Sequence, residues 1–176
     1  MNRIKMDDHP VLAAIRHRRS VRHFTQEPIS DEVVDQILEA GRWAPSGKNN
    51  QPWRFAVIRE PSVRASLASL THYGSVLRAA PILIAVFLDH GQVYDRTKDV
   101  LAVGACIQNM LLAIHALGLG GVWLGEILKN KERVGEVLGA CNDWELMAVI
   151  ALGHPSSKKG GKGERAPLQE KVFWRR

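Results

Sequence analysis

The sequence predicts one α+β or α/β domain over residues 1–176, with helices around a central sheet and a C-terminal arm at about residues 154–176. Three observations support this fold class. The chain has 176 residues, 45% hydrophobic and 24% charged, which is the size and composition of one compact globular domain. Stretches with helical and strand patterns alternate irregularly along it. A polar, glycine-rich stretch, HPSSKKGGKGERAP, then follows the last strand.

The helices are predicted from apolar spacing and from their start signals. Residues 10–18 begin with Pro10, which suits the first turn of a helix. Residues 31–44 follow Ser30, a preferred N-cap, and carry two acidic residues in the first turn and an apolar face. Further helices are predicted for residues 61–70, 100–117 and 131–139.

The strands are predicted from short runs of β-branched and aromatic residues. These runs are WRFAVI at residues 53–58, PILIAVFLD at 81–89 and WELMAVIALG at 144–153, and they have the length of buried strands. After the 100–117 helix, LGLGG marks a helix stop followed by a strand or loop. The last predicted segment is LQEKVFW at 168–174.

Residues 100–125 contain no charged side chain and are long enough to cross a bilayer. They include Gln108, Asn109 and His115, however, and end in glycines, so a helix enclosed by its own domain or by a partner subunit is the favoured interpretation. The N-terminus lacks the pattern of a signal peptide. The two cysteines form no Cys-x-x-Cys motif. We therefore expect a cytoplasmic protein with no membrane segment and no metal site.

The formal net charge of +6 is concentrated at the C-terminus, where residues 157–176 hold seven Lys/Arg and two Asp/Glu. Such a tail is compatible with nucleic-acid binding, but also with a solvated terminus that contributes one useful cation. A second basic group is RHRRSVR at residues 16–22. Guanidinium groups bind phosphate bidentately, although cations at a helix C-terminus are also common without any ligand.

A loop is predicted within RWAPSGKNNQPWRF, residues 42–55, which has neither helical nor strand periodicity. Its amide side chains at residues 49–51 each offer a donor and an acceptor, as recognition of a polar heterocycle requires. Pro45 and Pro52 restrict its backbone, while Trp53 is predicted to be core. A third candidate, GLGGVWLGE at residues 118–126, allows close approach of backbone to a ligand, but a plain turn is the more frequent explanation of such a stretch.

Taken in order, these stretches resemble the FMN-dependent nitroreductase family over nearly the whole chain. The segments that carry the resemblance are RRSVRHF, APSGKNNQPWRF, GACIQNMLLAIHALGLGGVWLG, GHP, GERAPL and VFW. The most specific element is P-S-x-x-N-x-Q-P-W, which starts at Pro45 and ends at Trp53. The resemblance implies a nitroreductase-like fold, with a mixed or antiparallel sheet and a C-terminal arm that reaches a partner subunit.

The resemblance also implies which residues bind FMN. Arg18, Arg19, Ser20 and the late Arg165 would hold the phosphate, and Arg22 would reach the pyrimidine end of the flavin. Pro45, Ser46 and Gly47 would lie along the isoalloxazine. Polar contacts would come from Asn49 and Gln51, in this family from the partner subunit of a homodimer. Backbone N–H groups would face N5 and O4 of the flavin, at Leu124, Gly125 and Glu126.

Two departures from the family pattern affect this assignment. Gly163 stands where many relatives have a lysine, which leaves open whether Lys162 contacts the phosphate. The segment around His72 does not reveal which residue replaces the amide that relatives offer to the flavin ring. The chain is also shorter than many relatives.

The resemblance implies an NAD(P)H-dependent oxidoreductase that reduces nitroaromatics, quinones or related electrophiles by ping-pong hydride transfer. No catalytic side chain is predicted, because the flavin carries the chemistry. Three alternatives stay open: reductive dehalogenation, degradation of the flavin and, from another class, a basic nucleic-acid-binding protein. The expected partner is a second copy of the chain, with no nucleic acid and no membrane.

Overall fold

The structure is a computed structural model that describes residues 6–156 and 163–175. Its helices are α1 (Pro10–His17), α2 (Asp31–Arg42), α3 (Pro61–Ala68), α4 (Gly74–Ala79), α5 (Arg96–Ala116) and α6 (Lys131–Leu138). Its strands are β1 (Trp53–Ile58), β2 (Ile82–Asp89), β3 (Gly120–Leu124) and β4 (Trp144–Gly153). Short 3₁₀ turns include Gly47–Asn49, Glu126–Asn130 and Leu168–Lys171.

The four strands form one sheet in the order β1-β2-β4-β3, with antiparallel pairing between all neighbours. Beyond β3, Ser20 makes an isolated parallel bridge with Gly121, so the segment after α1 lies along the sheet edge. The α+β prediction is confirmed, and of its two sheet types the antiparallel one is present.

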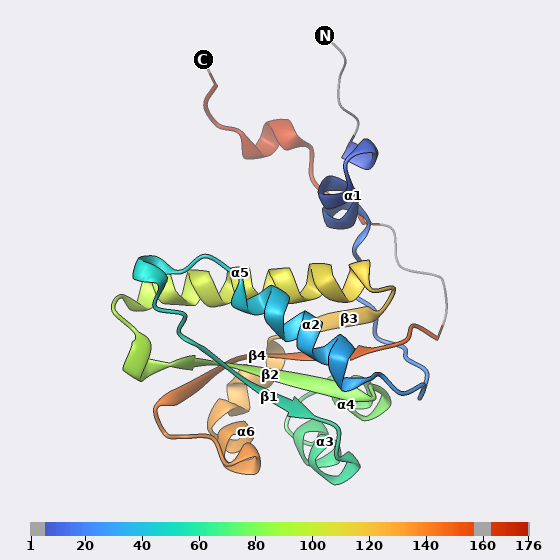
Figure 1. The fold of residues 1–176 in the computed structure, drawn as a ribbon, viewed down its shortest axis with the longest axis vertical. Coiled ribbons are helices and arrows are strands. Elements are labelled where there is room, and N and C mark those ends of the chain that lie inside the picture. The colour runs from blue at the N-terminus through green and yellow to red at the C-terminus, as the bar shows by residue number, and fades with distance from the viewer. Residues whose placement is uncertain (1–5, 157–162, 176) are drawn as a thin grey trace.

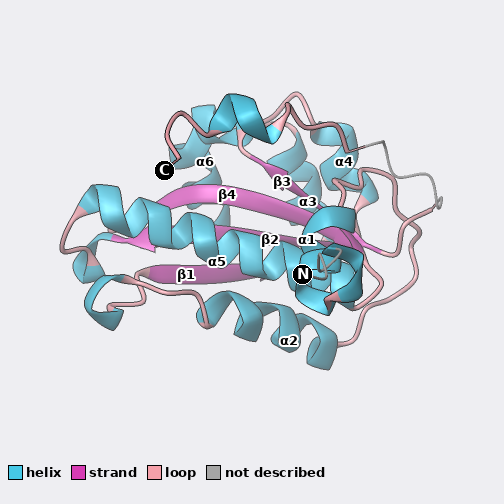
Figure 2. Ribbon diagram, turned by 90° about the horizontal axis from the view of Figure 1, so that it is seen from above, coloured by secondary structure: helices cyan, strands magenta, loops and turns pink. Residues whose placement is uncertain are grey.

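Helices cover both faces of the sheet (Figure 1). The long α5 and the neighbouring α2 lie on one face, whereas α3, α4 and α6 lie on the other. Figure 2 shows α5 in front of the sheet, running in roughly the same direction as the strands. Every residue of the central strand β2 is buried, because both of its faces are covered. Two apolar cores result, and Trp53 lies in the α2/α5 core as the sequence predicted.

Most predicted boundaries lie within two residues of those in the structure, and the two larger differences concern α5 and α4. Helix α5 begins at Arg96, four residues before the predicted start, because the carboxylate of Asp95 caps it by accepting from the Lys98 N–H at 3.0 Å. The short helix α4 was not predicted at all. It has six residues, of which Gly74, Val76 and Leu77 are buried, too short a run for a periodic pattern to be recognised.

Helix α5 is only partly enclosed by its own chain. It is long and apolar enough to cross a membrane by length and composition, and 44% of its most apolar window is buried in this fold. Its buried face packs on the sheet and on α2, whereas Leu101 is 69% exposed on the opposite side. An apolar groove of about 400 Å³ follows this open side beside α1, lined partly by Val11, Leu112 and Ala113.

Candidate functional site

An arginine cluster, formed by Arg18, Arg19 and Arg165, brings together the two ends of the chain. Arg18 and Arg19 follow α1 directly, and the Val21 N–H donates to the Gly121 carbonyl at 3.0 Å, which fixes this segment to β3. The Arg19 guanidinium donates to the backbone carbonyl of Arg18 at 2.8 Å. Ser20, in the bridge to Gly121, is exposed next to these side chains in sequence.

The charges of the arginine cluster act on one another. Burial, followed by the positive charges of Arg165 and Arg19, lowers the pKa of the Arg18 guanidinium. The C-terminal tail therefore passes close to Arg18, although 147 positions separate the two arginines in the sequence. A Cβ built at Gly163 would overlap the Arg19 guanidinium, so the tail approaches the cluster through a residue without a side chain.

The arginine cluster lies beside the C-terminal end of α5. Burial lowers the pKa of the His115 imidazole, and the charges of His17, Arg18 and Arg19 lower it further. Within the described residues no carboxylate forms an ion pair with Arg18 or with Arg165. The Arg165 Nη1 donates instead to the neighbouring Glu164 carbonyl at 2.7 Å. An anion bound here would relieve repulsion between cations, which makes phosphate a chemically suitable ligand.

The Pro45–Gln51 loop forms the second part of the candidate site. The Ser46 hydroxyl accepts from the Gln51 N–H at 3.0 Å, and a 3₁₀ turn at Gly47–Asn49 closes the loop. A Cβ built at Gly47 would overlap the hydroxyl of Tyr94, so this glycine lets the Tyr94 ring pack directly on the loop backbone. Pro45 is exposed, as is Asn49.

The amides of the loop do not all face outward. Asn50 is turned into the protein, where its Nδ2 donates to the Gln92 carbonyl and to the Asp99 carboxylate, each at 2.8 Å. Gln51 donates to the Asn49 side chain at 3.3 Å. The sequence hypothesis that residues 49–51 all offer amides to a ligand is therefore wrong for Asn50.

The turn after β3 holds the third group of predicted residues. Leu124 is buried at the end of the strand, whereas Gly125 is exposed, and a Cβ built on Gly125 would meet nothing within 4 Å. The backbone beside Gly125 is thus open to a ligand.

The Glu126 carboxylate points away from that open backbone, toward the α3–α4 connection. It accepts from the Thr71 hydroxyl at 2.6 Å and from the His72 N–H at 3.1 Å, and pairs with Lys129. Lys129 and Thr71 lower the pKa of Glu126 to about 2. The structure places the divergent segment around His72 at this turn, a contact that no sequence pattern indicated.

Two other predicted residues are placed less closely. Arg22 is exposed two positions beyond the Ser20 bridge, and no described contact joins its side chain to the arginine cluster. Lys162 lies outside the described residues.

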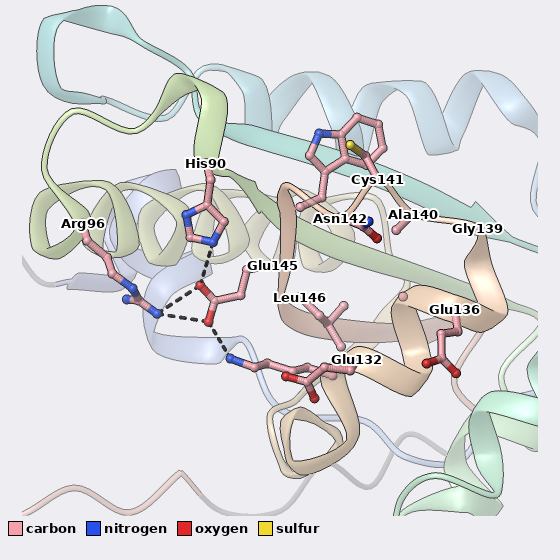
Figure 3. A pocket seen from close by; sticks show the side chains of 13 residues that line it. His90, Arg96, Glu132, Glu136, Gly139, Ala140, Cys141, Asn142, Glu145 and Leu146 are labelled. Atoms are coloured by element: carbon pink, nitrogen blue, oxygen red, sulfur yellow. Dashed lines mark hydrogen bonds and ion pairs between the residues drawn. The ribbon is translucent and has the colours of Figure 1, made fainter.

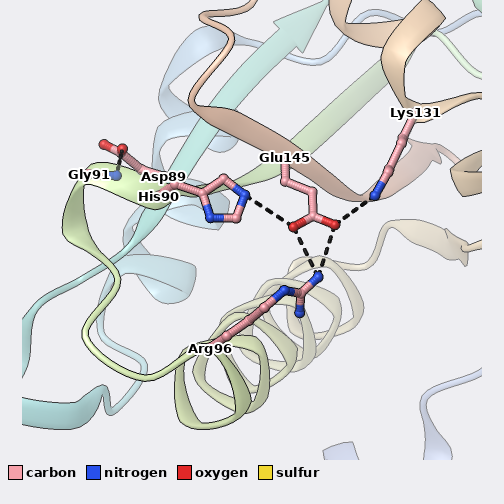
Figure 4. A network of polar contacts seen from close by, with 6 residues as sticks. All are labelled: Asp89, His90, Gly91, Arg96, Lys131 and Glu145. Carbon is pink, nitrogen blue, oxygen red and sulfur yellow. Dashed lines mark hydrogen bonds and ion pairs between the residues drawn. The ribbon is translucent and has the colours of Figure 1, made fainter.

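A separate cavity of about 560 Å³ lies between α6 and the start of β4 (Figure 3). Its Glu145 carboxylate pairs with His90 at 3.2 Å, Arg96 at 3.0 Å and Lys131 at 2.8 Å (Figure 4). Burial alone would raise the pKa of Glu145, but these cations outweigh it and the pKa is lowered. No predicted site residue lines this cavity, and the three cations that contact Glu145 neutralise its carboxylate.

The arginine cluster and the Pro45–Gln51 loop lie at opposite ends of α5 (Figure 1). Asp99 contacts the loop near the start of the helix. Near its end, burial and the charges of Arg18 and Arg19 lower the pKa of His115. At a rise of 1.5 Å per residue, these two positions are about 24 Å apart along the helix axis.

Comparisons with known proteins identify the family. The sequence model of the nitroreductase family matches residues 15–72 and 61–154. The chain belongs to the nitroreductase family. A relative from Archaeoglobus fulgidus, named NADH dehydrogenase/NAD(P)H nitroreductase, is 35% identical to this nitroreductase-family chain over 152 residues, which are 84% of the chain and 87% of the relative.

Solved structures agree with this assignment. A Desulfovibrio desulfuricans structure, described as a nitroreductase in complex with FMN, matches with a TM-score of 0.91 and 48% identity, over 96% of this chain and 98% of that one. The NADPH:FMN oxidoreductase of Vibrio harveyi, complexed with NAD⁺, matches with a TM-score of 0.87 and 25% identity, over 96% and 78%. The predicted family and the nitroreductase-like fold are confirmed.

Proposed function

We propose that this chain is one FMN-binding domain of an NAD(P)H-dependent flavin oxidoreductase of the nitroreductase type, which reduces nitroaromatic, quinone or related electrophilic acceptors. The observation that carries the proposal is the arginine cluster. Two ends of a chain of this family converge on a point where cations repel one another and Arg18 has no carboxylate partner among the described residues.

At the phosphate end, Arg18, Arg19 and Arg165 bind the FMN phosphate through charge-assisted hydrogen bonds, and the Ser20 hydroxyl donates a further one. Arg22 reaches the pyrimidine end, where a positive charge stabilises the anionic reduced flavin. When bound, FMN supplies the redox chemistry, because its N5 accepts hydride from NAD(P)H and later passes it to the acceptor.

At the ring end, Pro45, Ser46 and Gly47 lie along the isoalloxazine, and Asn49 and Gln51 supply polar contacts. The backbone N–H groups of residues 124–126, where Gly125 is exposed, would face N5 and O4 of the flavin. No side chain of the protein transfers a proton in this scheme. The residues bind the flavin, orient it and tune its charge.

We further propose a homodimer in which each FMN site combines the arginine cluster of one copy with the Pro45–Gln51 loop of the other. The separation of about 24 Å along α5 supports this arrangement, because it places the two parts of one chain at opposite ends of a long helix. The exposed side of α5, with Leu101 and the apolar groove beside Val11, supplies apolar surface for a second copy.

The proposal also includes a cytoplasmic location. Both cysteines are unpaired, and burial raises the pKa of the Cys106 thiol to about 12, so that it acts as a small apolar core residue. A chain without disulfides suits a reducing compartment.

The absorption spectrum of the purified protein tests the flavin assignment. We expect a yellow protein that releases free FMN on denaturation and loses its oxidised-flavin absorbance when NADH or NADPH is added without air. Adding a quinone or a nitroaromatic should then restore the oxidised spectrum. A colourless protein whose apo form binds no FMN at micromolar concentration, but binds nucleic acid with steep salt dependence, would establish the alternative function.

Mixed dimers test the shared site. In a heterodimer of Arg18→Ala and Asn49→Ala chains, one site carries both lesions and the other carries neither. Co-refolding two poorly binding variants should therefore recover up to half a tight FMN site per chain in the heterodimer fraction, and none in either homodimer. No recovery in verified heterodimers would place both residues in a site within one chain.

A further inference from the structure

Asp99 is a fully buried carboxylate in the first turns of α5. Three N–H groups donate to it: Asn50 Nδ2 at 2.8 Å and the backbone N–H groups of Tyr94 and Asp95 at 3.0 and 3.1 Å. No cation of the described chain forms an ion pair with it. A buried carboxyl group is costly to maintain unless hydrogen bonds satisfy its oxygens, and these three contacts do so.

The Asn50 contact ties the Pro45–Gln51 loop to this carboxylate. Both groups near Asn50 Nδ2, the Gln92 carbonyl and the Asp99 carboxylate, are acceptors, which fixes the orientation of the amide. The Asn50 Oδ1 is buried and has no hydrogen-bond partner among the described residues. The amide thus gives up one hydrogen bond in order to hold the loop against α5.

The loop needs such an anchor because its backbone is strained. Lys48, Asn49 and Gln51 have φ angles of 54°, 55° and 48°, in the left-handed region that costs most side chains about 1 kcal/mol or more. Residues hold this conformation only where their surroundings fix it. The Asp99 carboxylate is linked to the loop in two ways. It accepts directly from Asn50, and it accepts from the N–H of Tyr94, whose ring packs on Gly47.

We propose that Asp99 is the positioning residue of the flavin-ring contact, acting through Asn50 and Tyr94 rather than by touching the flavin. The carboxylate keeps the Pro45–Gln51 loop in its strained conformation before the flavin arrives, which removes the cost of ordering the loop on binding. This inference rests on the proposed function for the ligand, but not for the state of the loop.

Two variants remove the link from opposite sides. Asp99→Asn keeps the shape of the side chain and replaces one acceptor oxygen by an N–H₂ group, which cannot satisfy all three donors. Asn50→Ala removes the loop's own donor and leaves both backbone bonds of Asp99 in place, so it tests the link if Asp99→Asn folds poorly. Asp95→Asn is the matched control. It removes a carboxylate four residues away on the same helix start, and asparagine is an equally good N-cap.

We expect Asp99→Asn and Asn50→Ala to weaken the binding of FMN and of riboflavin by the same factor, about five- to tenfold, because the proposed loop contact is with the ring that both ligands share. Hydrogen exchange of the loop amides, measured by mass spectrometry on the ligand-free protein, should accelerate by a similar factor in both variants. Asp95→Asn should match the unmodified chain in both measurements.

Flavin binding and hydrogen exchange together distinguish failure of the proposed function from failure of the proposed role of Asp99. If the unmodified chain binds no flavin, the proposed function fails, and exchange alone still decides whether Asp99 fixes the loop. If the unmodified chain binds FMN but both variants exchange and bind like Asp95→Asn, Asp99 is not a positioning residue. A loss confined to FMN, with riboflavin unaffected, would also overturn the proposal, because it would place the effect at the phosphate.

Discussion

In the proposed FMN site, the arginine cluster and the Pro45–Gln51 loop would hold one ligand in opposite ways. The arginine cluster is assembled from distant segments, and the charges of Arg165 and Arg19 contribute to lowering the pKa of Arg18. The loop is a continuous stretch whose polar groups are tied to the protein, with Ser46 bonded to Gln51 and Asn50 bonded to Asp99. On this proposal the phosphate would stabilise the arginine cluster, whereas hydrogen bonds within the protein hold the loop without a ligand.

The difference predicts how each region responds to mutation. A bound anion reduces the repulsion between the arginine charges, so the proposed phosphate end contributes mainly to the affinity for FMN. A strained loop fixed by hydrogen bonds contributes through preorganisation, and its loss affects every ligand that shares the ring. FMN and riboflavin differ only in the phosphate, so the pair reports the two regions separately.

The largest effect is expected at the phosphate end. Arg18→Ala or Arg165→Ala removes a charge-assisted hydrogen bond worth roughly 1.5 to 3 kcal/mol, which corresponds to a loss of FMN affinity of about tenfold or more. Riboflavin affinity should hardly change, because riboflavin has no phosphate. Titration of the apo-protein with each flavin measures both values. Equal losses for the two flavins would place these arginines away from the phosphate.

The second effect is expected at the ring end. In Gly47→Ala the new Cβ overlaps the Tyr94 hydroxyl, so either the ring or the loop must move, at a cost of roughly 1 to 3 kcal/mol. We expect a several-fold loss of affinity that is equal for FMN and riboflavin.

Gly135→Ala is the control for this substitution. It adds the same methyl group within α6, on the other face of the sheet, where the nearest atom is 3.9 Å away. This variant should bind both flavins normally and unfold at a slightly higher temperature, because alanine favours a helix by about 1 kcal/mol over glycine. A normal flavin affinity in Gly47→Ala would show that the packing of Tyr94 does not fix the loop.

The two regions also differ in how far the sequence could predict them. The loop is encoded locally, and a short motif was enough to locate Pro45, Ser46 and Gly47 together. The arginine cluster required the position of the tail, which became predictable only through the family resemblance. The strands β1, β2 and β4 were predicted nearly to the residue, since continuous apolar runs identify buried strands.

Other features depend on contacts that no local pattern contains. The inward orientation of Asn50 follows from Asp99, a residue 49 positions away. The bond from Thr71 to Glu126 spans 55 positions. Asp99 itself looked like an ordinary acidic residue near a helix start, and only its complete burial marks it as an anchor. Buried polar contacts of this kind are specified by the tertiary fold.

The third prediction concerns Glu126, in the turn after β3. Because the pKa of this carboxyl is lowered to about 2 in the fold, its contribution to stability is present above the unfolded value near 4.5 and is lost as the pH falls toward 2. Glu126→Gln should therefore lower the unfolding temperature at pH 7 and have a smaller effect at pH 3. Thermal unfolding at both pH values measures the difference. An effect of equal size at both would show that the charge is not involved.

The smallest effect tests whether the loop is strained. Lys48 has a φ of 54°, and asparagine adopts this conformation more readily than lysine. Lys48→Asn also removes a cation 5.0 Å above the Tyr94 ring, a contact worth about 0.5 to 1 kcal/mol at an exposed site, so the two changes nearly cancel. Lys98→Asn removes the second cation, 5.2 Å above the same ring, from an ordinary helical position. We expect Lys48→Asn to change the free energy of unfolding by less than about 0.5 kcal/mol and Lys98→Asn to lower it by more. Chemical denaturation of the two variants measures this difference. If Lys48→Asn is as destabilising as Lys98→Asn, then replacing lysine relieves nothing, and the loop holds its conformation without strain at that position.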